Sequence, residues 1–105
     1  MLYRYIAVIS EAEGVFYAKV PDIVGCITTA NNLQEAIMLI TDALNLALTV
    51  LEDENITPNQ PTLQSEIQHN PCDILTVIQA DTMKYRKLLS LPDRKSTRLN
   101  SSHNA

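Results

Sequence analysis

The sequence has little glycine and little positive charge, and each shortage excludes a class of function. Its two glycines, Gly14 and Gly25, lie eleven residues apart, so neither a Walker A loop nor a GxGxxG fingerprint can be written. Eight Lys and Arg stand against 12 Asp and Glu, a net charge of −4 that disfavours nonspecific nucleic-acid binding as the main activity. No apolar run approaches the roughly 18 residues of a membrane span and no leader pattern opens the chain, so we expect a cytoplasmic protein without a membrane segment.

Cysteine and histidine are equally scarce. Cys26 and Cys72 form no CxxC pair and have no histidine at metal-ligand spacing, which predicts two reduced, structural thiols. His69 stands alone in a proline-rich stretch, and His103 lies near the C-terminus. The sequence therefore lacks a histidine placed to complete a Ser/His/Asp or Cys/His catalytic arrangement. We expect no enzyme activity, no cofactor and no metal site.

The chain length and the character of its last residues define one domain. A length of 105 residues with 46% hydrophobic and 19% charged content is typical of a single globular domain. After Pro92 the sequence turns polar, and residues 93–103 (DRKSTRLNSSH) resemble, codon by codon, the translation of a widely used sequencing adapter. We expect residues 1–92 to be a native domain cut off there, and residues 93–105 to be a disordered, adapter-derived tail. Residues 1–92 carry 5 basic and 11 acidic side chains, a net charge of −6.

Hydrophobic periodicity predicts a mixed α+β domain. Residues 2–9 alternate as a strand, with Tyr3, Tyr5, Ala7 and Ile9 on one face. A loop of about five residues (10–14) then leads into a second strand, 15–20, and the Pro21–Cys26 turn leads into a short third strand, 26–29. A proline-rich connection over 55–71 precedes a fourth strand, 74–79, and a short amphipathic stretch, 82–90. The expected fold is a three- to four-stranded, antiparallel-rich sheet in β-β-β-α-β order with a short C-terminal helix.

The central segment predicts one long helix. Asn32 and Glu35 have the spacing of a capping box, and apolar residues continue at helical spacing to Leu51. Four further apolar residues widen the stripe beyond what one sheet face needs: Met38, Leu39, Leu46 and Val50. These side chains either contact a partner or belong to a broad internal core face.

The acidic residues allow two interpretations. Asp22, Glu35 and Asp42 would have to converge around Mg²⁺ in an active nuclease. The alternative is that they are solvated surface acids, because they stand in turns or on the polar side of the helix.

The ordered motifs resemble the HicB family of antitoxins. The residues that carry this resemblance are Val15–Asp22 with Gly25 and Cys26, then Glu35 and Ala36, Ala43 and Leu44, Ile56–Pro61, and Ile78–Arg86. Two departures occur: Val24 stands where the family commonly has a second proline, which predicts a less rigid turn, and the SEAEG loop replaces the usual Asp-Gly turn. The family motif maps onto Pro21, Asp22, Gly25, Cys26, Glu35 and Ala36.

The resemblance implies a fold, a partner and a function. The fold is a catalytically degenerate, partial ribonuclease-H-like domain, and the partner is a HicA-type toxin, a small basic protein that cleaves mRNA. The antitoxin would neutralise this toxin by covering its active site, and we expect a homo-oligomer that binds DNA only through a C-terminal domain absent from this sequence. We expect partner contacts at Glu11, Glu13, Asp22, Met38 and Leu46. The alternative function is an orphan HicB-like module that oligomerises and regulates without a toxin partner.

Overall fold

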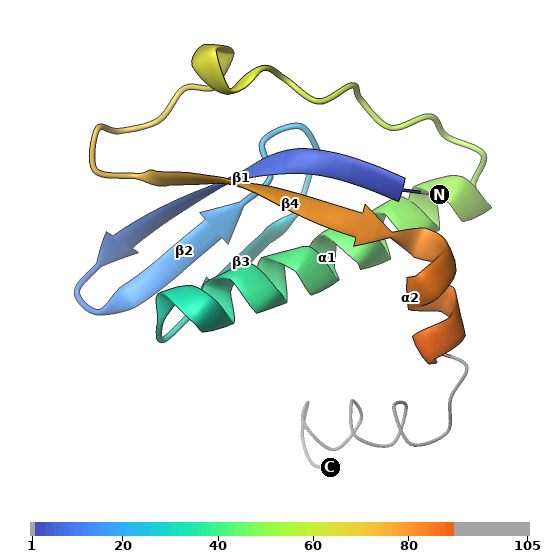
Figure 1. Ribbon diagram of the computed structural model, residues 1–105, viewed down its shortest axis with the longest axis horizontal. Coiled ribbons are helices and arrows are strands. Elements are labelled where there is room, and N and C mark those ends of the chain that lie inside the picture. The colour runs from blue at the N-terminus through green and yellow to red at the C-terminus, as the bar shows by residue number, and fades with distance from the viewer. Residues whose placement is uncertain (1, 90–105) are drawn as a thin grey trace.

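A computed structural model describes residues 2–89; the predicted tail, 93–105, lies outside the described residues. The elements are β1 (Leu2–Ala12), β2 (Val15–Lys19), β3 (Ile27–Ala30), α1 (Leu33–Asp53), the 3-10 turn η1 (Gln64–Glu66), β4 (Ile74–Asp81) and α2 (Thr82–Leu89). Every neighbouring pair in the sheet is antiparallel, in the order β3-β2-β1-β4. Figure 1 shows α1 lying along one face of this sheet and α2 turning away at the end of β4. The predicted α+β class, the single long helix and the short C-terminal helix are confirmed.

The β1–β2 hairpin is tighter than its sequence predicts. The expected five-residue loop is wrong, because β1 continues to Ala12 and only Glu13 and Gly14 remain in the turn. Both have positive φ angles, 53° and 80°, as a two-residue type I′ turn requires. The register therefore pairs Ala12 with Val15 across the turn. One glycine suffices for this turn, and Glu13 takes the left-handed conformation beside it.

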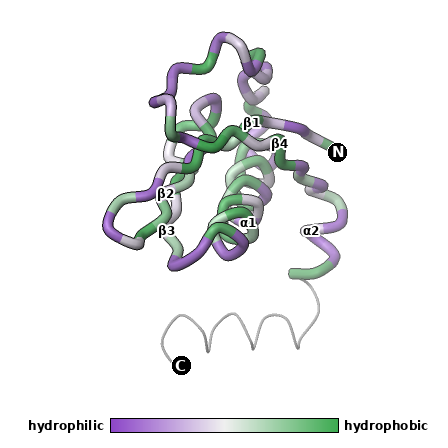
Figure 2. Tube along the Cα trace, turned by 60° about the vertical axis from the view of Figure 1, so that its left-hand side comes forward, coloured by the Kyte–Doolittle hydropathy of each residue, from purple (hydrophilic) through white to green (hydrophobic). Residues whose placement is uncertain are grey.

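The alternating face of β1 forms the centre of the core, as predicted. Tyr5, Ala7 and Ile9 are buried against α1, and Tyr3 packs at the edge of the same cluster. Figure 2 shows hydrophobic residues concentrated in β1 and α1, with hydrophilic residues at the β1–β2 turn. Because β1 lies between β2 and β4, its helix-facing side chains are covered on every side. This position explains why the strand's odd-numbered residues are nearly all apolar.

Helix α1 begins with the predicted capping interaction. The Asn32 side-chain oxygen accepts the Glu35 N–H at 2.8 Å, and a Glu35 carboxylate oxygen accepts the Asn31 N–H at 2.8 Å. The reciprocal bond thus goes to the residue before the cap, and it still satisfies an exposed backbone donor at the helix start. One row of α1 side chains is completely buried against the sheet: Ala36, Ile40, Leu44 and Leu48.

The length and composition of α1 also meet those of a membrane-spanning helix, with a mean hydropathy of 1.3. The sequence-based exclusion of any such segment was therefore too strict. Core helices of water-soluble proteins share this property, and α1 is amphipathic, with its apolar row packed on the sheet. The helix is weak evidence for a membrane.

A long connection from α1 to β4 crosses to the other face of the sheet. Ile67, just after η1, is buried against Ile6 and Val8, with Leu75 packed beside them. Figure 1 shows this connection running on the side of the sheet opposite to α1. The second face is thus covered by an irregular segment, which must be held in place by specific contacts because its own backbone forms few regular hydrogen bonds.

Candidate functional site

The Pro-Asp-x-x-Gly-Cys segment forms a closed turn between β2 and β3. Three backbone bonds close it: Val20 N–H to Cys26 O (3.0 Å), Ile23 N–H to Val20 O (3.1 Å) and Cys26 N–H to Ile23 O (3.2 Å). Gly25 has a φ of 79°, a left-handed conformation that glycine adopts without steric cost. Ile23 and Cys26 insert into the core, whereas Val24 between them is 94% exposed. The turn is therefore fixed without the second proline that the family commonly has.

Asp22 fastens the α1–β4 connection to this turn. Its carboxylate accepts the Thr62 N–H at 2.8 Å and the Thr62 hydroxyl at 2.5 Å, and its backbone carbonyl accepts the Asn59 side-chain amide at 2.9 Å. From the core side, the Tyr5 hydroxyl donates to the Asn59 backbone carbonyl. Burial, and then the nearby Asp22 charge, raise the pKa of Tyr5. The structure thus gives Asp22, one of the predicted partner contacts, a role inside the domain as well.

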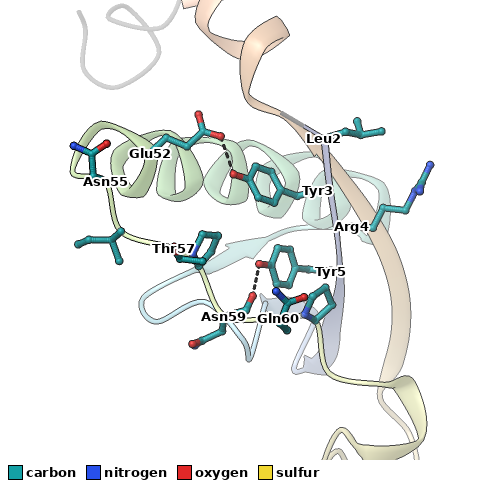
Figure 3. A pocket seen from close by; sticks show the side chains of 12 residues that line it. Leu2, Tyr3, Arg4, Tyr5, Glu52, Asn55, Thr57, Asn59 and Gln60 are labelled. Carbon is teal, nitrogen blue, oxygen red and sulfur yellow. Dashed lines mark hydrogen bonds between the residues drawn. The ribbon is translucent and has the colours of Figure 1, made fainter.

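A hollow lies beside this clamp. It has a volume of about 580 Å³ and is lined by the start of β1, the end of α1 and the first residues of the connection. Figure 3 shows Tyr3 and Tyr5 pointing from β1 towards α1 and the connection, with Leu2 and Arg4 on the opposite side of the strand. The two tyrosine rings stack, with centroids 6.5 Å apart. The lining of the hollow includes neither a histidine nor a cysteine, and the hydroxyls of both tyrosines donate hydrogen bonds, Tyr3 to Glu52 and Tyr5 to the Asn59 carbonyl.

Glu52 joins three elements at the rim of this hollow. Its carboxylate accepts the Tyr3 hydroxyl at 2.8 Å (Figure 3), the Thr82 hydroxyl at 2.9 Å and an Arg86 N–H at 3.2 Å. Burial opposes the charged carboxylate, but the three hydrogen bonds outweigh it and lower the pKa of Glu52. Burial and the bond to Glu52 raise the pKa of Tyr3 to about 12. This network positions α2, because Arg86 also pairs with Asp53 at 3.0 Å.

A second hollow, of about 400 Å³, lies on the other side of the connection's first residues. Its walls are the exposed tip of the turn at Val24, the α1 residues Val50 and Leu51, and Ile56 of the connection. Asp22 is the single charged residue among those that line it. The two hollows share residues 56–59, so the first residues of the connection form a wall between them.

The expected partner-contact residues do not form one surface. Glu11 and Glu13 lie at the β1–β2 turn, and Asp22 lies in the clamp. Met38 is 64% exposed in a groove between α1, β4 and α2, while Leu46 is 51% exposed and lines neither this groove nor the two hollows beside the connection.

The four apolar residues that widen the stripe of α1 divide between the core and the surface. Leu39 packs against the core, as the internal alternative predicted, but Met38, Leu46 and Val50 reach solvent. The interpretation as a fully internal face is therefore wrong for these three residues. Sequence reasoning missed the two residues that bond Asp22 in the clamp, Asn59 and Thr62. Asn59 lies within the family-like segment 56–61, whereas no sequence signal indicates Thr62.

The acidic residues proposed for a nuclease have separate structural positions. Asp22 bonds Thr62, and Glu35 caps the start of α1. Within residues 2–89, no group of three His, Cys, Asp or Glu side chains is placed to hold a metal ion.

The two cysteines differ in burial. Cys26 is buried, and burial raises the pKa of its thiol to about 11, which keeps it protonated and unreactive. Cys72 is exposed in the connection. The expectation of a structural thiol is consistent with Cys26 but wrong for Cys72, because the surface segment leaves its side chain without a core to join.

Comparison with solved structures identifies the same fold in three proteins. A chain of a "HicA3 and HicB3 toxin-antitoxin complex" matches with a TM-score of 0.60 and 21% identity, covering 75% of this chain and 99% of that one. A toxin–antitoxin complex from Streptococcus pneumoniae matches with a TM-score of 0.71 and 13% identity, covering 100% and 91%. The N-terminal domain of the Burkholderia pseudomallei antitoxin HicB matches with a TM-score of 0.61 and 20% identity, covering 77% and 99%. At these identities the likeness establishes the fold alone.

Comparison with protein families gives a match over nearly the whole chain. The model of the HicB-like antitoxin of bacterial toxin–antitoxin systems matches residues 5–102. No curated protein matches the sequence. The Pro-Asp-x-x-Gly-Cys turn, the capped helix and the clamped connection all lie inside the matched range. This chain belongs to the HicB-like antitoxin family of bacterial toxin–antitoxin systems.

Proposed function

We propose that this chain neutralises a small, basic, mRNA-cleaving toxin of the HicA type by covering its active site, without catalysis of its own. The observation that carries the proposal is the family match over residues 5–102. The acidity of the domain, −6 over residues 1–92, supports it. A surface that binds mRNA must present positive charge to phosphates, and an acidic protein is attracted to the same surface. The antitoxin would therefore compete directly with the RNA.

The side chains of residues 2–89 support a binding role. The one histidine of this part, His69, is exposed and bonds the neighbouring Asn70 carbonyl through a ring nitrogen. The buried nucleophile, Cys26, is held protonated. In the larger of the two hollows beside the connection, the Glu52 carboxylate accepts the Tyr3 hydroxyl and the Asn59 carbonyl accepts the Tyr5 hydroxyl, so these groups serve the packing of the domain.

The partners and location of the protein follow from this proposal. We expect a cytoplasmic protein, because its target would be mRNA. Self-association is expected through exposed apolar side chains such as Met38, and an orphan oligomeric module would use these same side chains without a toxin. DNA binding is not assigned to residues 2–89, and it would require the C-terminal domain of longer family members.

Co-expression tests the proposal. The full chain and a HicA-type toxin, a short basic protein, are placed under separate promoters in a bacterial host. Expression of the basic protein alone should arrest growth and deplete mRNA, and expression of the chain should restore both. A stable complex should also elute as one species in gel filtration. Growth arrest that persists, with no complex, would reject neutralisation and favour the orphan module.

The role of residues 93–105 is tested by the same assay. We propose that this segment is adapter-derived and contributes nothing to toxin binding, although the family match extends through residue 102. A chain that ends at Pro92 should restore growth as well as the full chain does. Loss of rescue by the shortened chain would show that the segment belongs to the functional protein.

A further inference from the structure

The exposure of Val24 has no explanation within the domain. Its neighbours Ile23 and Cys26 are in the core, Gly25 takes the left-handed turn conformation, and Asp22 holds the connection. Val24 is 94% exposed between them, on a backbone that the turn's own hydrogen bonds fix. The Val24 side chain contributes almost nothing to the stability of this domain, since almost none of its apolar area is buried.

Val24 is part of a larger apolar surface beside the second hollow. Val50 on α1 is 43% exposed and Ile56 on the connection is 49% exposed, and both line the 400 Å³ hollow with Val24. Leu46, 51% exposed, lies one helical turn before Val50 on the same side of α1. Three separate segments thus bring four aliphatic side chains together, and we call these four residues the Val24 surface. Contiguous exposed apolar side chains of this kind mark interaction sites.

The charge around the Val24 surface is negative. The last turn of α1 contains no basic residue, although the carbonyl end of a helix favours cations there. Glu52, Asp53 and Glu54 follow Leu51, and Glu54, one helical turn after Val50, is exposed. Asp22 lines the hollow itself. Within residues 2–89, Arg86 from α2 forms ion pairs with Glu52 and Asp53, and neither of these carboxylates lines the hollow, so the acidic rim consists of Asp22 and Glu54.

We propose that the Val24 surface is the site at which this antitoxin contacts its toxin, and that it receives an apolar side chain from a cationic face of that protein. The proposal rests on the proposed neutralising function and names its contact surface. An apolar centre with an acidic rim is complementary to an apolar knob surrounded by Lys and Arg. Desolvation of the four aliphatic side chains would supply affinity, and the acidic rim would select the cationic partner.

Two arginine variants test the proposal, Val24→Arg and Val50→Arg. Each places a positive charge on the surface while the side chain stays in water, so the fold is expected to persist, as circular dichroism and the thermal midpoint would report. The matched control is Val77→Arg, because Val77 is 60% exposed on the opposite face of the sheet. The binding partner is a purified, basic HicA-type toxin, and its binding to the full-length chain is measured by calorimetry.

The expected result is that each test variant weakens binding by about 30-fold or more, the effect typical of an interface hot spot, and that the control changes binding by less than about threefold. Equal binding by the wild type and by both test variants would overturn the contact assignment while leaving neutralisation intact. Failure of the wild type to bind the basic protein would instead reject the proposed function, and the contact site with it. A change in self-association without a change in toxin binding, seen by light scattering, would assign the Val24 surface to a second copy and refute the proposal.

Discussion

Replacing Asp22 tests whether the clamp, and not a partner contact, is the role of this residue. Asp22→Ala removes the carboxylate that accepts two hydrogen bonds from Thr62. The backbone N–H and the hydroxyl of this half-buried residue then both lose their acceptor. Hydrogen bonds to charged groups contribute about 1.5–3 kcal/mol each when buried, and partial exposure reduces this. We therefore expect a loss of about 2–3 kcal/mol in the free energy of unfolding. At a urea slope of about 1 kcal/mol/M, the midpoint would fall by roughly 2–3 M.

Asp22→Asn is the matched control. The amide oxygen can accept the Thr62 N–H and the amide nitrogen can donate to the Thr62 hydroxyl, so only the charge is lost. This variant should lose about 1 kcal/mol or less. Limited proteolysis should also cut the connection, residues 55–73, faster in Asp22→Ala than in Asp22→Asn, because the unclamped segment opens locally. Midpoints of the two variants that agree within about 0.5 M would refute the clamp.

Three further predictions concern the cap, the core thiol and the pH dependence. Asn32→Ala should cost about 1 kcal/mol of stability in urea unfolding, since it removes the side-chain acceptor at the start of α1; an unchanged midpoint would contradict the cap. A neutral thiol reagent at pH 8 should modify only Cys72 in the native protein and also Cys26 in urea, as mass spectrometry would show; native labelling of both would contradict the burial. Tyr3 has a pKa of about 12 when folded and 10 when unfolded, so the stability that this shift represents is present below pH 10 and is lost as the pH rises towards 12. The wild type should thus lose stability more steeply than Tyr3→Phe between pH 10 and 12, and identical slopes would exclude the Tyr3–Glu52 bond as the cause.

The sequence predicts those features whose causes are local. Alternation along β1 identifies the face that Tyr5 and Ile9 bury, and the spacing of Asn32 and Glu35 identifies the start of α1. The type I′ turn at Glu13 is not predicted by local pattern, because a non-glycine residue with a φ of 53° is uncommon. The hairpin is therefore shorter than expected.

The clamp could not be predicted because its causes are distant in sequence. Asp22 and Thr62 lie forty residues apart, and nothing near either residue indicates the other. A single acidic residue in a turn is usually a solvated charge, so the sequence does not indicate that Asp22 bonds Thr62. The exposure of Val24 likewise becomes visible only when the neighbouring side chains are known to point inward. The fold and the family were thus accessible from patterns, whereas the surface for a partner required the three-dimensional arrangement.

Neutralisation by occlusion is tested most directly by RNA cleavage. A purified, basic HicA-type toxin is incubated with a fluorescent RNA oligonucleotide while the full chain is added in increasing amounts at several RNA concentrations. Occlusion predicts complete inhibition at stoichiometric antitoxin, with an apparent inhibition constant that rises in proportion to the RNA concentration because the two compete for one cationic surface. An inhibition constant independent of RNA concentration, or a purified complex that still cleaves RNA, would contradict the account.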